Sequence, residues 1–190
     1  MAAEARRIVL LGAPGSGKGT QAALLADALG VPAVSTGEML RAAVAEGSQL
    51  GERVASIMNA GDLVDDATMA DVVRQRLSQN DAARGFLLDG FPRTLDQAAT
   101  LASILGAAEK TLDVVIQIEV PEAKLVSRAL DRQREDDTEE VIKNRLQVYE
   151  EKTAPLVDHY DELGLLETID GDQSIENVAQ AMLATLGVMV

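Results

Sequence analysis

Cysteine is absent from this sequence of 190 residues, as is tryptophan, and histidine occurs once, at His159. Without cysteine there can be no disulfide framework, no zinc site built on thiolates and no thiol redox chemistry. No apolar run approaches the roughly 20 residues that a transmembrane helix needs. The first apolar run, from Ile8 to Leu11, ends at a glycine-rich segment and is too short for a signal peptide. These absences predict a cytoplasmic protein with no membrane anchor.

Positive charge is scarce as well, because 17 Lys and Arg face 31 Asp and Glu, for a formal net charge of −14. This balance argues against nucleic acid as a partner, since that would need an extended basic face. The apolar content of 47% excludes disorder and allows one substantial core. If so acidic a chain binds an anion, it must gather its few cations locally. His159 lies outside every motif described below, and we interpret it as structural.

The segment from Ile8 to Thr20, IVLLGAPGSGKGT, joins a strand-like apolar run to a glycine-rich turn, and the helix-forming run QAALLADAL follows. Backbone N–H groups of such a turn and the N-terminus of the helix attract anions, and Lys18 adds a full positive charge. The match to G-x-x-x-x-G-K-[ST] ends at Lys18, with Gly19 where the hydroxyl belongs. The segment predicts a nucleotide phosphate site. The alternative is a surface turn with an unrelated lysine.

Apolar, strand-like runs alternate with amphipathic helical stretches along the chain. We expect strands at Arg7–Leu11, Ala33–Ser35, Gly85–Asp89, Asp113–Glu119 and Leu165–Ile169. This alternation predicts an α/β fold of the P-loop type, a three-layer sandwich in which helices flank a five-stranded parallel sheet. Ligands of such folds bind beyond the carboxyl ends of the strands.

The turn DGFPR follows the third expected strand, so its side chains should lie at that edge of the sheet. Asp89 would stand beside the phosphate loop and can orient Mg²⁺ through its water shell. Gly90 allows close approach of a ligand, and Arg93 offers a planar fork of donors suited to phosphate. An ordinary turn with a paired surface arginine is the alternative.

Other arginines lie near expected helix ends. Ser35 or Thr36 should cap a helix that carries Arg41, and Thr138 should cap a helix that carries Arg145. A second cluster consists of Arg128, Arg132, Arg134 and Arg145. Such like charges repel unless an anion lies between them, although a solvated helix face is the usual alternative.

Together these segments resemble adenylate kinase of the short-lid bacterial type. The stretches GAPGSGKGTQ, STGEMLR, AGDLV, GFLLDGFPRT, R-x-x-x-R-x-R-x-DDT and NRL-x-x-Y occur in the order typical of that family and cover nearly the whole chain. Gly19 in place of the hydroxyl is itself typical of these nucleoside monophosphate kinases. The resemblance implies transfer of the γ-phosphoryl group of ATP to AMP, with Mg²⁺ and with two ADP as products. The short lid has no cysteine, so the zinc-bearing lid of some relatives is excluded.

The resemblance also assigns residues to sites. It implies that the ATP phosphates lie on Gly15, Ser16, Gly17, Lys18, Gly19 and Thr20, that Arg132 contacts ATP, and that Arg128 and Gly171 border its base. The implied AMP site comprises Thr36, Arg41, Asp62, Leu63, Val64, Gly90, Phe91, Pro92, Arg93 and Gln97, with Arg134 and Arg145 on its phosphates. The implied catalytic cations are Lys18, Arg93, Arg128, Arg132, Arg134 and Arg145. The chain is expected to be one domain, 1–190, with a mobile AMP-binding segment at 35–64 and a short lid at 131–137, and to be a monomer.

Three other functions remain open at this point. A UMP or CMP kinase is the alternative within the same class, although Thr36 in STG is less typical of such enzymes. A non-catalytic nucleotide sensor of the same fold is a second, but it would not need a full set of cations around the transferred group. A kinase for a small metabolite, similar to shikimate or gluconate kinase, would share only the phosphate loop.

Overall fold

The computed structural model describes residues 6–131 and 138–188. Its strands are β1 (Arg7–Leu11), β2 (Ala33–Ser35), β3 (Phe86–Asp89), β4 (Val114–Glu119) and β5 (Leu166–Asp170). Its α-helices are α1 (Lys18–Leu29), α2 (Thr36–Ala45), α3 (Gln49–Ala60), α4 (Asp66–Leu77), α5 (Leu95–Ala107), α6 (Glu122–Asp131), α7 (Glu139–Val148), α8 (Pro155–Glu162) and α9 (Ile175–Thr185). Two short elements, the 3₁₀ turn η1 (Asn80–Ala82) and the π-helix η2 (Tyr149–Thr153), complete the described chain.

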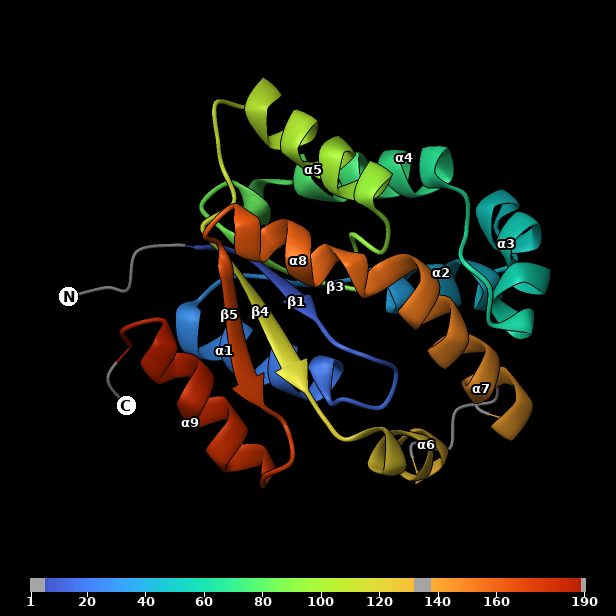
Figure 1. Ribbon diagram of the computed structural model, residues 1–190. Coiled ribbons are helices and arrows are strands. Elements are labelled where there is room, and N and C mark those ends of the chain that lie inside the picture. Colours follow the sequence, from blue (N-terminus) through green and yellow to red (C-terminus); the bar gives the residue numbers. More distant parts are fainter. Residues whose placement is uncertain (1–5, 132–137, 189–190) are drawn as a thin grey trace.

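The five strands form one parallel sheet in the order β2-β3-β1-β4-β5. Helices cover both faces: α1 and α9 lie on one side, and α4, α5 and α8 lie on the other (Figure 1). Each connection between strands includes at least one helix, because parallel strands need a crossover that returns the chain to the same end of the sheet. The predicted α/β sandwich is therefore confirmed, and each observed strand boundary lies within one residue of the expected one.

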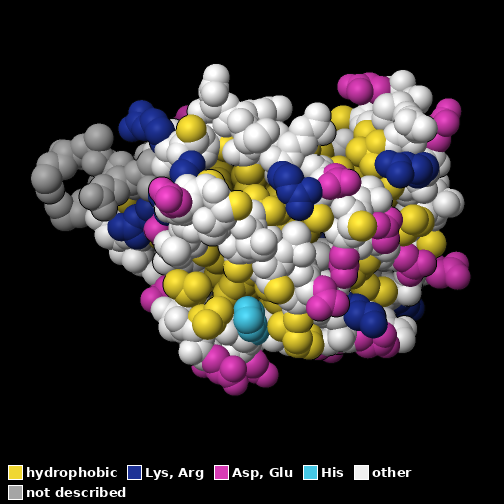
Figure 2. Space-filling model, turned by 90° about the horizontal axis from the view of Figure 1, so that it is seen from above, with side chains coloured by type: hydrophobic (Ala, Val, Ile, Leu, Met, Phe, Trp, Pro, Cys, Tyr) yellow, Lys and Arg dark blue, Asp and Glu magenta, His cyan; other side chains and the backbone are white. Residues whose placement is uncertain are grey.

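Charged side chains of both signs are spread over the surface. Figure 2 shows acidic groups distributed over the whole of one face, with lysines and arginines and patches of apolar side chains between them. Within residues 6–131 and 138–188, no helix combines the length and the apolar character needed to cross a membrane.

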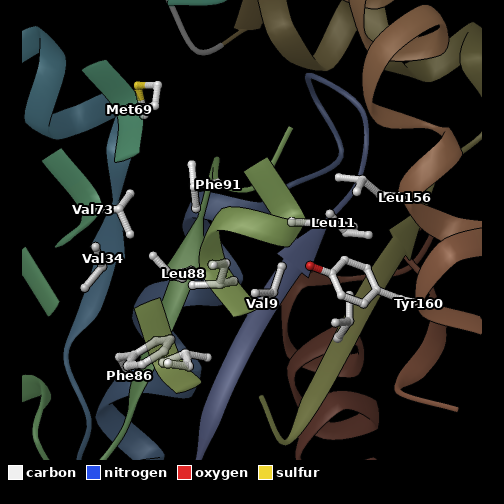
Figure 3. Packing of buried hydrophobic residues seen from close by; sticks show 14 of the residues in the cluster. Val9, Leu11, Val34, Met69, Val73, Phe86, Leu88, Phe91, Leu156 and Tyr160 are labelled. Atoms are coloured by element: carbon white, nitrogen blue, oxygen red, sulfur yellow. The ribbon is translucent and has the colours of Figure 1, made fainter. Parts of the chain in front are cut away.

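The core has two halves because successive side chains of a strand point to opposite faces of the sheet. In β1, Val9 and Leu11 face the helices α4, α5 and α8, whereas Ile8 and Leu10 face α1 and α9. Figure 3 shows the first half, in which side chains from the sheet meet Met69 and Val73 of α4 and Leu156 and Tyr160 of α8. The centre of the sheet is thus buried on both faces, and β1, β3 and β4 are nearly continuous apolar runs for that reason.

The neighbouring strands β1 and β3 send the chain to opposite faces of the sheet. The helix after β1 packs in one half of the core through Ala22 and Leu25, and the helix after β3 packs in the other half through Ala98 and Leu101. Connections that diverge in this way leave a crevice at the carboxyl ends of the two strands. The phosphate loop and the DGFPR turn border this crevice.

Candidate functional site

A cavity of about 890 Å³ lies at the carboxyl end of the sheet. It is lined by the phosphate loop, the first turns of α2, the segment after α3, the DGFPR turn, and parts of α6, α7 and the segment after β5. The predicted site residues that line it are Gly15, Ser16, Gly17, Lys18, Gly19, Thr20, Thr36, Arg41, Asp62, Leu63, Val64, Asp89, Gly90, Pro92, Arg93, Gln97, Arg128, Arg145 and Gly171. The fold thus brings together residues that are up to 156 positions apart, from Gly15 to Gly171.

The phosphate loop is built on backbone that only glycine adopts easily. Gly15 has φ +89°, and a Cβ there would clash with the carbonyl oxygen of Leu125 in α6, so the loop packs directly on that helix. The Lys18 ammonium group donates to the carbonyl oxygens of Gly12 at 2.6 Å and Ala13 at 3.1 Å. Lys18 therefore lies across the loop at the N-terminus of α1, whose first turn has no acidic residue. A phosphate placed there would meet a lysine, backbone N–H groups and the positive end of a helix dipole.

Asp89 lies at the end of β3. Two hydroxyl groups contact it, one from the neighbouring strand β2 and one from the start of α2. The Ser35 hydroxyl donates to Asp89 Oδ2 at 3.4 Å, and the Thr36 hydroxyl donates to the Asp89 carbonyl oxygen at 3.4 Å. Ser35 occupies the predicted N-cap position of α2, but its side chain makes no cap hydrogen bond there. Both hydroxyls are directed across the sheet because β2 pairs with β3 in a register that sets Ser35 beside Asp89.

Arg93 is held in place by contacts on several sides. Its Nε donates to the carbonyl oxygen of Gly90 at 2.9 Å, and its own carbonyl oxygen accepts from the Thr153 hydroxyl at 2.9 Å. Gly90 has φ +86°, and a Cβ there would lie 2.7 Å from Thr36 Oγ1 and 3.1 Å from Arg93 Nη2, so only glycine fits this turn. The guanidinium group is thus ordered before any ligand arrives.

The electrostatics of Arg93 indicate an anion site. Burial lowers the pKa of Arg93 below its ordinary value, the Asp89 carboxylate opposes this, and the positive charges of Arg145 and Arg41 lower the pKa further. Arginine nevertheless stays protonated in proteins. Three guanidinium groups are therefore close enough to repel one another, with the Asp89 carboxylate beside them, and a bound phosphate would relieve this repulsion.

The loop between α3 and α4 joins the cavity to α7. α3 ends at Ala60, and Gly61 follows as its C-cap in the left-handed conformation that favours glycine. Arg145 donates to the carbonyl oxygen of Met58 at 3.4 Å, and Asn144 donates to Asp62 Oδ1 at 3.0 Å. Thr138 caps α7 by accepting from the N–H of Val141 at 3.3 Å, as predicted. The cap and these contacts position Arg145 over the cavity.

The opposite end of the cavity is formed by α6 and the segment after β5. Arg128 donates to the carbonyl oxygen of Gly171 at 2.9 Å and forms an ion pair with Asp172 at 3.4 Å. A Cβ on Gly171 would lie 2.5 Å from a methyl group of Ile118, so the chain runs close over β4 there. Arg128 and Gly171, which the resemblance assigns to the border of the ATP base, therefore lie in contact.

The described part of the chain does not place three of the predicted site residues at the cavity. Phe91 does not line the cavity: its side chain is fully buried in the hydrophobic core below the turn. Its predicted place in the AMP site therefore has no support from its side chain. Arg132 and Arg134, with the expected lid at 131–137 apart from Asp131, lie outside the described residues.

Two residues that the sequence analysis did not identify hold the predicted ones in position. Thr153 supports the backbone of Arg93, and Asp66 accepts from the side-chain amide of Gln97 at 2.7 Å. These pairs are separated by 60 and 31 residues. No local pattern in the sequence marks either contact, because each depends on how distant helices pack.

Among the described residues, no group of three or more His, Cys, Asp or Glu side chains could hold a metal ion. Asp89 lines the cavity beside the phosphate loop, with Oδ2 3.8 Å from where a Cβ on Gly19 would stand. A carboxylate oxygen beside a phosphate site fits Mg²⁺, which keeps most of its waters and shares its coordination with nucleotide phosphates.

Comparison with known proteins gives one consistent result. The model of the family described as "Adenylate kinase" matches residues 10–165. A protein named adenylate kinase from Nocardia farcinica is 50% identical over 181 residues, which cover 95% of this chain and 99% of that protein. Adenylate kinases from Thermobifida fusca and Leptospira biflexa are 48% and 44% identical, each over 95% of this chain and over 97% and 100% of their own lengths.

Proposed function

Since the chain belongs to the adenylate kinase family, we propose that it catalyses the reversible, Mg²⁺-dependent transfer of the γ-phosphoryl group of ATP to AMP, which gives two ADP. The observation that carries this proposal is the meeting of Lys18, Arg93 and Arg145 with the phosphate loop at one cavity. Phosphoryl transfer asks for alignment and for stabilisation of negative charge, and this cavity provides cations and backbone donors.

We assign the donor half of the cavity to the side bordered by α1 and α6. The loop from Gly15 to Thr20 would hold the triphosphate, with Lys18 exchanging its loop carbonyls for phosphate oxygens. Arg128 and Gly171 would border the base, and the predicted contact of Arg132 with ATP lies outside the described residues.

We assign the acceptor half to the side bordered by α2, α5 and α7. Arg41, Arg93 and Arg145 would bind the phosphate of AMP, an assignment supported by their electrostatic coupling at one place. The remaining predicted residues of this half line the same cavity: Thr36, Asp62, Leu63, Val64, Gly90, Pro92 and Gln97. Arg134 is assigned here by resemblance alone.

Asp89 would hold Mg²⁺ through water, since its carboxylate lies between the phosphate loop and the acceptor half. The ion, when bound with ATP, supplies positive charge that offsets the charge of the phosphates. The work of the chain itself is to fix the two nucleotides in line and to exclude water, which would otherwise be phosphorylated instead of AMP. We infer that the segment 35–64 moves to achieve this exclusion. The lid assigned to 131–137 lies outside the described residues apart from Asp131.

We further infer that the protein is a cytoplasmic monomer that does not bind nucleic acid. The absence of cysteine, the net charge of −14 and the family resemblance support this inference. Light scattering of the purified protein would test the oligomeric state, and we expect the molar mass of one chain, 20.1 kDa.

A coupled assay that offers ATP with AMP, UMP or CMP tests the proposed function. We expect turnover with AMP to exceed that with either pyrimidine nucleotide, and preferred use of UMP or CMP would refute the assignment. Tight binding of two adenosines joined by five phosphates would show that both nucleotide sites are occupied at once.

The Arg93→Lys variant separates a kinase from a nucleotide sensor. Loss of the planar fork that contacts the transferred group should lower kcat by about 100-fold. Arg84→Lys is the matched control, because Arg84 is exposed and does not line the cavity. Weaker nucleotide binding in the Arg93 variant, with no turnover above background in the unaltered protein, would favour a sensor.

A further inference from the structure

The side-chain amide of Gln97 is held at both ends, although Gln97 also lines the cavity. Its Oε1 accepts from the backbone N–H of Arg93 at 2.7 Å, and its Nε2 donates to Asp66 Oδ1 at 2.7 Å. The side chain is almost fully buried, with 2% of its surface exposed. Each of the two amide atoms keeps one further hydrogen-bonding position.

The chemistry of the two partners determines which way the amide faces. A backbone N–H can only donate, and a carboxylate can only accept. Rotating the amide by half a turn would set its NH₂ group against the N–H of Arg93 and its oxygen against the Asp66 carboxylate. Both hydrogen bonds would become repulsive contacts, so Gln97 is confined to one orientation.

Asp66 is itself firmly placed. It is the first residue of α4, directly after Asp65, which caps the helix by accepting from the N–H of Thr68 at 2.9 Å. The hydroxyl of Thr94 also donates to Asp66 Oδ1, at 3.4 Å. Because Thr94 caps the helix that carries Gln97, the carboxylate joins the starts of two helices that pack together.

We propose that Asp66 is a positioning residue that makes the site select a 6-aminopurine over a 6-oxopurine nucleotide. The proposal rests on the proposed function and adds that the base of AMP lies against Gln97, which lines the acceptor half of the cavity. Adenine offers an acceptor at N1 and a donor at its 6-amino group, which match the remaining donor and acceptor of the fixed amide. Hypoxanthine offers the reverse pair, a donor at N1 and an acceptor at O6. Only a rotated amide would match it, and Asp66 opposes that rotation.

The variant Asp66→Asn tests the proposal. An asparagine can present either an oxygen or an NH₂ group to Gln97 in a side chain of nearly the same size. The variant thus removes one of the two constraints on the amide, and only the N–H of Arg93 still opposes its rotation. We expect the ratio of kcat/KM for AMP to kcat/KM for IMP to fall by about tenfold, which is the worth of roughly one hydrogen bond. IMP is the informative competitor because it differs from AMP only at the edge that Gln97 would read.

Asp65→Asn is the matched control, since it makes the same chemical change one residue earlier and keeps a residue type that caps helices well. It should leave the AMP-to-IMP ratio unchanged. Asp66→Ala provides a second variant should the first not fold, and it too must lower the ratio because no carboxylate then faces a rotated amide.

The outcomes separate this inference from the proposed function. Equal losses for AMP and IMP in the Asp66 variants would show a merely structural role and overturn the inference, while the kinase activity of the unaltered protein stands. An unaltered protein that does not phosphorylate AMP would instead refute the proposed function, and the inference with it.

Discussion

At the scale of single residues, the two tyrosines of the chain have lost most of their contact with water. Tyr160 of α8 is 4% exposed and lies in the core half that faces α4, α5 and α8. Burial raises its pKa to about 12, and the pKa of Tyr149 also rises to about 12, through burial and the nearby carboxylates of Glu150 and Glu119. Burial penalises the phenolate because it loses its hydration.

The native protein should therefore show almost no tyrosinate absorbance at pH 10, the ordinary pKa of tyrosine, and should titrate near pH 12. Both pKa values are higher in the folded state, so the contribution of the two tyrosines to stability is complete below pH 10. It is lost as the pH rises from 10 to 12, because the unfolded chain releases its protons first. An ultraviolet pH titration with and without concentrated urea measures this difference. A native titration centred at pH 10 would contradict it.

Some features of the site could be predicted from the sequence, whereas contacts between residues on different elements could not. The phosphate loop and the DGFPR turn could be predicted because each is a continuous segment whose residue types have a local chemical meaning. The positions of Thr153 and Asp66 could not, since each is defined by a partner on another helix. Ser35 and Thr36 illustrate a third case, in which a local rule for helix capping was overridden by contact with the neighbouring strand.

At the scale of elements, the π-helix η2 supports the backbone of Arg93 through the hydroxyl of Thr153. The N–H of Ala154 bonds to the carbonyl oxygen of Tyr149 at 2.8 Å, a bond that spans five residues. Pro155 follows and has no N–H of its own to donate, which favours a widened turn at this point. The widened turn directs the buried hydroxyl of Thr153 to the carbonyl oxygen of Arg93.

Replacing Thr153 with valine should remove that hydrogen bond without changing the size of the side chain. The carbonyl oxygen of Arg93, which lies in a part-buried hydrogen bond, then loses its donor. We expect this loss to cost about 1–3 kcal/mol of stability and to lower kcat/KM for AMP. Urea denaturation and the coupled assay measure the two effects. Thr153→Ser should restore both, because serine keeps the donor.

Thr168→Val is the control for this experiment, since Thr168 is an exposed position in β5 that accommodates a β-branched apolar residue. If Thr153→Val and Thr168→Val behaved alike, the contact between η2 and Arg93 would have no role in the site.

The strands were the elements easiest to predict. The central strands β1, β3 and β4 are apolar runs that end at a glycine or a polar residue, because a parallel sheet covered on both faces needs apolar side chains in both directions. The π-helix left no such pattern, since its geometry arises from one proline and from packing beneath the DGFPR turn.

At the scale of the whole molecule, charge is divided unequally between the surface and the cavity. The chain has a net charge of −14, and acidic side chains are spread over the face seen in Figure 2. Lys18, Arg41, Arg93, Arg128 and Arg145 meet instead at the cavity. The surface charges repel one another, which destabilises the compact state, whereas the cavity attracts anionic nucleotides.

Salt should therefore act in opposite directions on folding and on binding. Raising sodium chloride from about 0.05 M to about 0.5 M screens both sets of charges. We expect the midpoint of thermal unfolding to rise and KM for AMP to rise with it. Calorimetry and the coupled assay test this pair of changes, and a fall of the unfolding midpoint would contradict the role given to surface repulsion.

The crevice between β1 and β3 has a consequence for how such an enzyme can diversify. The chain leaves β1 for one face of the sheet and β3 for the other, so each nucleotide half rests on its own hydrophobic layer. Mutations that alter the choice of phosphate acceptor can accumulate in α4 and α5 without disturbing the packing of α1 and α9. Donor use and acceptor preference can therefore evolve, or be redesigned, as separate traits of one protein.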